Sequence, residues 1–171
     1  SDTTSLSFTT VDISDPTLSS TTPADNATDI DVDSDFVINL YFSEAVDVET
    51  GNILLKKSFD DSTVESIDVT SNQVTGSGTT QITINPSSDL ASATQYYVQI
   101  PATAFDDSSS NSYAGITDTT SLSFTTADVI SPSLSSASPT DNATAVAVDS
   151  NIVLTFSEAV DIESGNILIK K

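Results

Sequence analysis

Apolar and polar residues alternate along much of the chain, with the two-residue period of a β-strand that buries one face. In the segment FVINLYF, Phe36, Ile38, Leu40 and Phe42 share one face, and the residues between them take the other. Thr, Val and Ile dominate such segments, and Ser, Asn, Asp, Gly and Pro fill the gaps between them. The pattern therefore predicts short strands joined by turns.

Seven main strands are predicted from this alternation, at 16–21, 36–43, 52–58, 63–69, 79–85, 95–101 and 119–126. A short extra strand is expected at 73–76. No segment carries the apolar stripe of a helix, and only 87–94 would accommodate a short helical turn. Short strands with turns between them are typical of a β-sandwich, so the expected fold class is all-β.

Two segments of the sequence each occur twice with few changes, which indicates an internal repeat. SDTTSLSFTT at 1–10 returns as TDTTSLSFTT at 117–126, and FSEAVDVETGNILLKK at 42–57 returns as FSEAVDIESGNILIKK at 156–171. The first pair is separated by 116 residues and the second by 114. A difference of two residues keeps every later side chain of a strand on its original face, so both copies can form the same sheet.

The repeat divides the chain into three parts. We expect the last strand of a preceding repeat at 1–11, a complete domain at 12–127, and an incomplete N-terminal part of the next repeat at 128–171. A repeat of about 115 residues is an ordinary size for a single domain. The chain is accordingly expected to be a segment of a tandem array.

Charge restricts the possible partners. The chain carries 25 acidic residues against 4 basic ones, a formal net charge of −21. Nucleic-acid binding is not expected, because no basic patch can neutralise phosphates, and anionic membrane surfaces would repel the chain. No apolar run is long enough for membrane insertion of this segment.

Enzymatic chemistry is not expected either. The sequence has no His and no Cys, so the usual nucleophile–base pairs are missing. Paired carboxylates can hydrolyse glycosides, but such sites usually stack sugars on aromatic rings, and Trp is absent. The acidic residues then have two interpretations, which are a solvated surface and the binding of divalent cations.

Four short motifs follow one another through the complete repeat. They are the Pro-x-Asp-Asn-Ala turn at 23–27, Phe-Ser-Glu-Ala-Val at 42–46, an Asn-Pro…Leu…Tyr run at 85–97, and the closing Ser-Phe-Thr-Thr at 123–126. In this order they resemble the bacterial Ig-like domain of S-layer proteins and giant repetitive surface adhesins. The resemblance implies an Ig-like seven-strand antiparallel β-sandwich in tandem repeats, on an extracellular or bacterial cell-surface protein.

In the implied Ig-type topology, three acidic segments should lie at one end of the sandwich. They are the incoming linker, the connection between the second and third strands, and the connection between the last two strands. Together they supply Asp12, Asp15, Glu44, Asp47, Glu49, Asp106, Asp107 and Asn111. No Lys or Arg falls in these segments, and Ca²⁺ takes about 6–8 oxygen ligands of these types. We therefore expect these residues to bind calcium at the junction with the preceding repeat.

The next repeat keeps part of this pattern. It has acidic residues in matching places, at Asp128, Glu158, Asp161 and Glu163. Ser131 stands where the complete repeat has Asp15, so that ligand is not common to both copies. A separate acidic run at 29–35 is expected at the opposite end of the sandwich, where a solvated surface is favoured over a second metal site.

Three functions remain open from the sequence. The favoured one is a non-enzymatic spacer in a large adhesin or fibre, in which calcium stiffens the junctions between neighbouring repeats. The second is a binding module that takes a glycan or a protein through exposed loops, with Tyr97 and Tyr113 as candidate contacts. The third is a self-assembling filament or S-layer subunit, in which the strand at 1–10 of one chain completes the unfinished repeat of another.

Overall fold

The computed structural model describes residues 7–32 and 35–170, which divide into two compact units between Asp128 and Val129. The first unit contains β1 (Leu18–Thr22), β2 (Ala27–Ile30), β3 (Ile38–Val48), β4 (Asn52–Lys57), β5 (Thr63–Asp68), β6 (Val74–Thr75), β7 (Thr79–Ile84), β8 (Gln95–Gln99), β9 (Phe105–Asp106) and β10 (Ser123–Thr126). The second contains β11 (Leu134–Ser138) and β12 (Val153–Phe156). The described residues include no helix that is long and apolar enough to cross a membrane.

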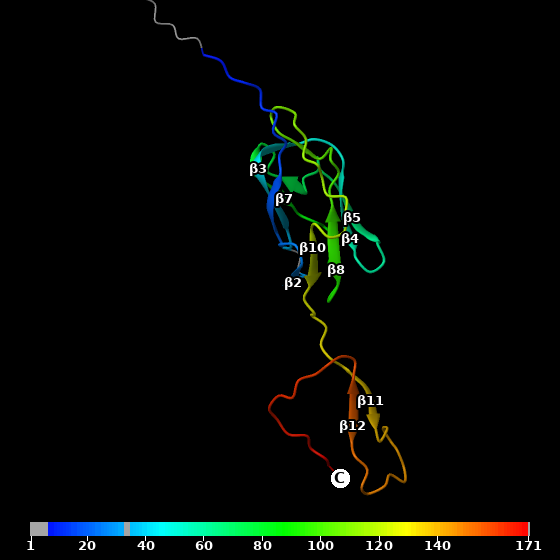
Figure 1. Cartoon of the computed structure of the whole chain (residues 1–171). Coiled ribbons are helices and arrows are strands. Elements are labelled where there is room, and N and C mark those ends of the chain that lie inside the picture. Colours follow the sequence, from blue (N-terminus) through cyan, green and yellow to red (C-terminus); the bar gives the residue numbers. More distant parts are fainter. Residues whose placement is uncertain (1–6, 33–34, 171) are drawn as a thin grey trace, which may run out of the picture. The chain divides into compact units, whose positions relative to one another are not determined.

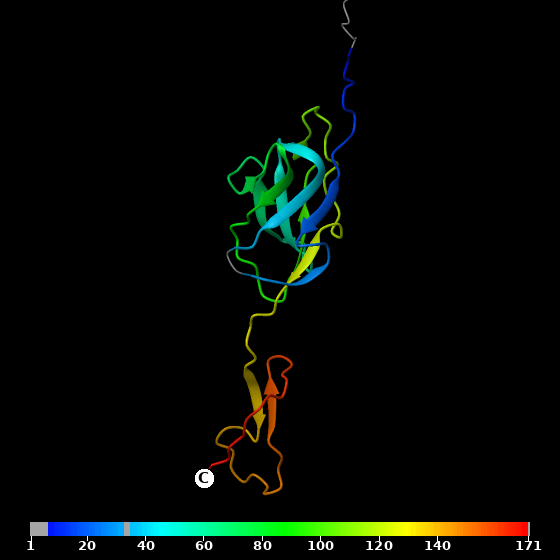
Figure 2. The same ribbon diagram turned by 90° about the vertical axis from the view of Figure 1, so that its left-hand side faces the viewer.

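The first unit is a sandwich of two five-stranded sheets (Figures 1 and 2). One sheet has the order β1-β3-β7-β6, with β9 paired to β3, and the other has the order β2-β10-β8-β4-β5. The strand pairs of these sheets are antiparallel, except that β10 and β2 are parallel. The prediction of an all-β sandwich is confirmed, and the prediction of wholly antiparallel sheets is wrong for β2 and β10.

The predicted alternation along β3 supplies the centre of the core. Ile38 and Leu40 are completely buried, and Ile38 pairs with Ile84 of β7 while Leu40 pairs with Ile82. Fully burying side chains of this size contributes about 1.5–3 kcal/mol each to folding. From the opposite sheet, the Phe124 ring of β10 is also completely buried. The inward positions of both sheets therefore meet as the period-two pattern requires.

Strands β2 and β9 were not predicted, and the last strand begins later than expected. Both unpredicted strands are too short to show a period in the sequence. Strand β10 begins at Ser123 instead of 119, because Asp118 Oδ1 accepts the backbone N–H groups of Thr120 and Ser121 at 2.8 and 2.7 Å. Such a local side-chain turn competes with the ladder for backbone donors.

The segment between β7 and β8 contains no helix among its described residues. The helical turn considered at 87–94 is therefore not found. The Tyr96 hydroxyl accepts the backbone N–H of Ala91 at 2.8 Å, and Leu90 is buried. This tyrosine thus satisfies a backbone donor that a helix would have paired within the segment.

One carboxylate fixes the start of this connection to β5. Glu65, on β5, accepts hydrogen bonds from Nε2 of Gln73 at 2.7 Å and from the backbone nitrogen and the hydroxyl of Ser87 at 2.9 and 2.7 Å. It also accepts the backbone N–H of Ser88 at 2.9 Å. Partial burial by itself raises the pKa of Glu65, but these hydrogen bonds outweigh it and lower the pKa to about 2.

Replacing Glu65 with Gln should lower the free energy of unfolding by about 1–3 kcal/mol at neutral pH, because an amide replaces a charged acceptor. The folded pKa lies below the ordinary value of 4.5, so the contribution of the ionised group is complete above pH 4.5 and is lost as the pH falls toward 2. Urea unfolding across this range measures the effect, with Ser66→Ala on the exposed side of β5 as control. A difference between Glu65→Gln and the wild type that does not change with pH would contradict this account.

In the second unit, β11 and β12 form an antiparallel pair. Along β12, Leu154 and Phe156 are 42% and 37% exposed, whereas their counterparts in the repeat, Leu40 and Phe42, are buried. In the first unit β7 pairs beside β3 and the second sheet covers it. The same sequence pattern therefore presents an uncovered apolar surface in the second unit.

Candidate metal site

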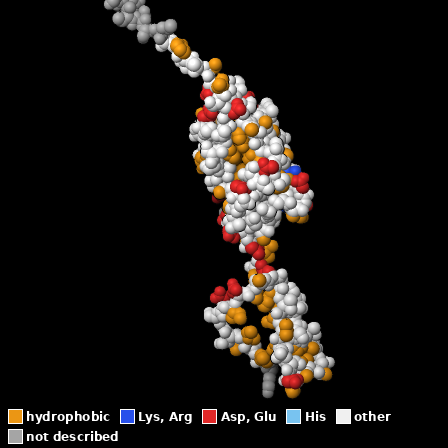
Figure 3. Space-filling view, viewed as in Figure 1, with side chains coloured by type: hydrophobic (Ala, Val, Ile, Leu, Met, Phe, Trp, Pro, Cys, Tyr) orange, Lys and Arg blue, Asp and Glu red, His pale blue; other side chains and the backbone are white. Residues whose placement is uncertain are grey.

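Three carboxylates converge where the chain enters the first unit. Asp12 lies before β1, Glu44 lies on β3, and Asp107 follows β9 directly. One oxygen from each lies within 4.8 Å of the other two. Figure 3 shows acidic side chains gathered at this end, beside the N-terminal segment. We call these three residues the acidic cluster.

Glu44 belongs to an irregular part of β3. Pairing between β3 and β7 is interrupted between Tyr41 and Val46, which marks a bulge in the register. A bulge redirects side chains relative to the regular pleat. Next to Glu44, the backbone N–H of Ser43 donates to the oxygen of Thr17 at 2.9 Å, which ties this part of β3 to the entering segment.

Asp107 organises the turn that follows β9. Its Oδ1 accepts the backbone N–H groups of Ser109 and Asn111 at 2.8 and 2.7 Å, and its Oδ2 accepts Nδ2 of Asn111 at 2.8 Å. The side chain is 6% exposed. Burial by itself raises the pKa of Asp107, but the hydrogen bonds outweigh it and lower the pKa. The turn thus keeps a buried carboxylate ionised beside Glu44.

Asn111 also holds the entering segment. Its Nδ2 donates to the backbone oxygen of Asp12 at 3.3 Å, and Oδ1 of Asp12 accepts the backbone N–H of Ser14 at 3.0 Å. We predicted Asn111 as an oxygen ligand, but its amide nitrogen is the atom that contacts the cluster. In this arrangement the residue anchors the linker to the domain.

The acidic cluster concentrates negative charge. Burial raises the pKa of Glu44, and the charges of Asp12, Asp107 and Asp15 raise it further. Lys56, on β4, forms its ion pair with Asp61 and not with the acidic cluster. Its Nζ lies 3.0 Å from the Asp61 carboxylate. A cation bound among the three carboxylates would offset this repulsion.

Four other predicted ligands lie outside the acidic cluster. Asp15 is near enough to raise the pKa of Glu44, but its carboxylate is not within the group of oxygens that lie 4.8 Å or less apart. Asp47 and Asp106 stand opposite each other on β3 and β9. Glu49 is exposed just beyond the end of β3.

The structure therefore brings together half of the predicted set, Asp12, Glu44, Asp107 and Asn111.

The donor chemistry of the cluster fits a hard cation. Asp107 keeps one lone pair for a cation, on Oδ2, because Oδ1 already accepts two hydrogen bonds and Oδ2 accepts one. The three carboxylates therefore offer up to five oxygens, and Ca²⁺ takes about 6–8 oxygens in flexible geometry, some of which can come from water. Zinc would favour His or Cys, which the sequence lacks.

The two tyrosines considered as ligand contacts are buried. Tyr97 is 1% exposed and Tyr113 is 6% exposed. The Tyr113 ring packs against Phe42 with centroids 5.2 Å apart, while the Tyr97 hydroxyl donates to Asp61 beneath Lys56. The prediction that these residues contact a glycan or protein is wrong, because packing uses their rings.

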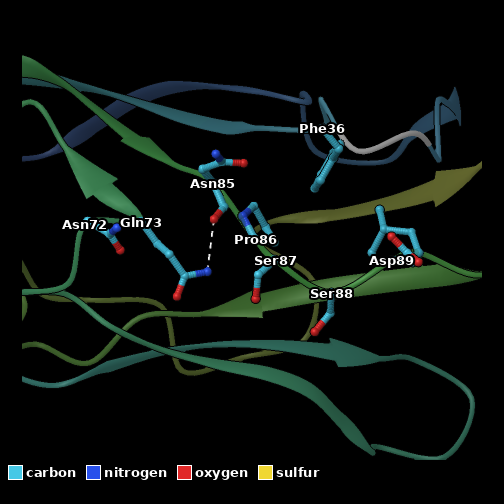
Figure 4. A pocket seen from close by; sticks show the side chains of 9 residues that line it. Phe36, Asn72, Gln73, Asn85, Pro86, Ser87, Ser88 and Asp89 are labelled. Carbon is cyan, nitrogen blue, oxygen red and sulfur yellow. Dashed lines mark hydrogen bonds between the residues drawn. The ribbon is translucent and has the colours of Figure 1, made fainter.

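A polar groove beside Glu65 was not predicted. It has a volume of about 550 Å³ and is lined by Phe36, by Asn72 and Gln73, and by the connection that follows β7 (Figure 4). The run Asn-Pro-Ser-Ser-Asp at 85–89 indicates only a turn from sequence. Its lining residues all lie outside the strands, in segments before β3, before β6 and after β7, so the strand pattern does not reveal it.

Comparison with solved structures finds matches at low sequence identity. CopC from Methylosinus trichosporium OB3b has 13% identity and a TM-score of 0.46, over 68% of this chain and 97% of that one. The S-layer protein SbsC (31–844) has 17% identity and a TM-score of 0.42, over 72% of this chain and 16% of that one. A structure of SbsC domains 1–6 gives 16% identity and a TM-score of 0.43, over 73% of this chain and 17% of that one.

No curated protein sequence matches the chain. A family model, described as the bacterial Ig-like domain, matches residues 12–126 and again residues 128–170. The two matches together cover most of the chain and follow the internal repeat of the sequence. This chain therefore belongs to the bacterial Ig-like domain family.

Proposed function

We propose that the chain is a non-enzymatic spacer in a large extracellular or cell-surface bacterial protein, such as an adhesin or a fibre, and that Ca²⁺ at the start of each repeat stiffens the junction with its neighbour. Domains of this family are generally non-enzymatic. Tandem copies of a sandwich suit a spacer, because each complete copy folds around its own core and adds one domain of length. The partners of each repeat are then the repeats before and after it.

The main support for this proposal is that the three carboxylates come from different parts of the chain. Asp12 belongs to the segment that leads into the domain, whereas Glu44 and Asp107 belong to the sandwich itself. An ion held by all three would fix the segment to the domain. Without an ion, the same charges repel one another and favour a loosely attached segment.

Calcium should bind residues 1–127 and raise their melting temperature. At a calcium concentration one hundred times the dissociation constant, the added stability is about 2.7 kcal/mol. Glu44→Gln should abolish most of the calcium-dependent increase, and in chelator it should not lower the melting temperature, because it removes a repelled charge. Titration calorimetry and thermal unfolding with calcium or EDTA measure both effects.

Glu49→Gln is the matched control, because this glutamate lies in the same region but outside the cluster. It should bind calcium as the wild type does. Equal loss in Glu44→Gln and Glu49→Gln would mean that the chain attracts calcium only through its net charge. No heat and no change in melting temperature would remove calcium from the proposal and leave a passive spacer.

Stiffening should be visible in a protein made of two copies of residues 12–127 in direct succession. Small-angle X-ray scattering should give a larger radius of gyration with calcium than with EDTA, because an ordered linker keeps the copies apart. The Glu44→Gln change in the second copy alone should remove the difference, whereas the same change in the first copy should leave it. Equal dimensions in calcium and EDTA for the unchanged protein would overturn the stiffening mechanism.

Self-association by strand addition is a second candidate function, favoured by the exposed apolar side chains of β12. An extended strand from another copy would pair with β12 on the side away from β11, as β7 pairs with β3 in the first unit. Sedimentation equilibrium of the whole chain should show a mass that rises with concentration. Leu154→Asp should restore the monomer and Ser135→Asp on β11 should not; a constant monomer mass for the wild type would exclude this assembly.

A further inference from the structure

The groove beside Glu65 is mainly polar and includes three apolar lining residues. The side chains of Pro86 and Leu90 are buried and that of Phe36 is half-buried. The Phe36 ring is fixed from behind by Phe124, with ring centroids 5.2 Å apart. The volume of about 550 Å³ falls within the range of about 300–1,000 Å³ that small-molecule sites occupy.

The lining carries hydrogen-bonding groups that the rest of the described chain does not use. The side chains of Asn72, Asn85, Ser88 and Asp89 line the groove and make no hydrogen bond to another described residue. Figure 4 shows Asn72 at one end of the lining and Asp89 at the other, with Asn85 and Ser88 between them. Amide, hydroxyl and carboxylate groups together can both donate to and accept from a ligand.

The groove is preorganised. Nε2 of Gln73 donates to Glu65 at 2.7 Å and to the backbone oxygen of Asn85 at 3.0 Å, which fixes Gln73 against the connection after β7 (Figure 4). Glu65 also holds the backbone of Ser87 and Ser88. A ligand would therefore meet groups whose positions are already set, which reduces the entropy lost on binding.

The charge of the groove selects the class of ligand. Among the described residues, Asp89 is the one charged residue that lines it, and no Lys or Arg does. Anionic ligands are disfavoured by this carboxylate and by the net charge of −21. A neutral polyhydroxylated ring fits both kinds of lining residue, since its C–H face can lie on Phe36 and Pro86 while its hydroxyls reach the polar groups.

We propose that this groove binds neutral saccharides, with Asn85 and Asp89 as hydrogen-bonding residues and Phe36 as the stacking residue. The site shares no residue with the acidic cluster and does not depend on the spacer role or on calcium. It adds to a structural repeat the capacity to hold a glycan along its length. It also replaces Tyr97 and Tyr113, whose rings are buried, as the basis for glycan contact.

The test uses the whole chain, labelled with ¹⁵N, and a panel of neutral di- and trisaccharides built from glucose, galactose, mannose, N-acetylglucosamine and N-acetylgalactosamine. At least one sugar should shift the side-chain amide signals of Asn72, Gln73 and Asn85 in a saturable way. The shifts should be the same in calcium and in EDTA. No saturable shift of these signals with any sugar of the panel would overturn the proposal.

Asn85→Ala and Asp89→Ala test the residues directly. Both side chains are exposed and lack hydrogen bonds within the described structure, so the variants should fold as the wild type does. Each should weaken binding at least about tenfold, the effect of losing about 1.4 kcal/mol. The matched controls are Asn151→Ala and Asp149→Ala, which change the same residue types in the second unit. Unchanged affinity in both groove variants, or equal weakening in the controls, would overturn the assignment.

Discussion

The position of β3 inside its sheet is the constraint on which the rest of the first unit depends. The first half of β3, up to Phe42, pairs with β1 and β7, and its end pairs with β9. Its inward residues Ile38 and Leu40 are completely buried. The same strand carries both these core residues and Glu44. The packing of the sandwich therefore helps to set the position of Glu44 in the acidic cluster. The position of Glu44 cannot shift without disturbing that packing.

The carboxylates of this chain differ in their hydrogen bonding and in the direction in which their pKa values are shifted. Glu65 and Asp107 accept several hydrogen bonds from the backbone and side chains of nearby loops, and these bonds lower their pKa values. Glu44 lacks such compensation and has a raised pKa. An acidic surface that served only solubility would need neither buried carboxylates nor repulsion among them. The contrast between Glu44 and Asp107 is therefore the strongest electrostatic argument for a cation at this end.

Sequence patterns predicted the core well because burial on one face leaves a period of two. The alternation through Ile38, Leu40 and Phe42 gave the correct inward face, and the strand ending at 126 contributes the buried Phe124 as expected. The beginning of that strand was misplaced because the turn at Asp118 depends on hydrogen bonds that have no periodic signal. A strand of two residues, such as β9, is defined only by its pairing with another strand and has no pattern of its own in the sequence.

The candidate site could be predicted only in part, for a similar reason. Topology implied that the linker and two connections share one end, and this brought Asp12, Glu44 and Asp107 together. Which acids of a connection face inward depends on the local bulge and on the turn after β9, and these exclude Asp47 and Asp106 from the group. The groove was not predicted because it is lined by connections that are distant in sequence and carry no periodic signal.

The two copies of the repeat differ in a way that separates structural from functional positions. Apolar residues that build the core recur, as Leu40 does at Leu154. The acidic run DIDVDSD at 29–35 becomes AVAVDSN at 145–151, so its charge is dispensable for the fold. Asp12 and Glu44, in contrast, recur as Asp128 and Glu158. Asp15 is not kept, because Ser131 takes its place, so the two copies share Asp12 and Glu44 of the acidic cluster rather than every acid of the junction. The proposed cation would use the acids that both copies keep.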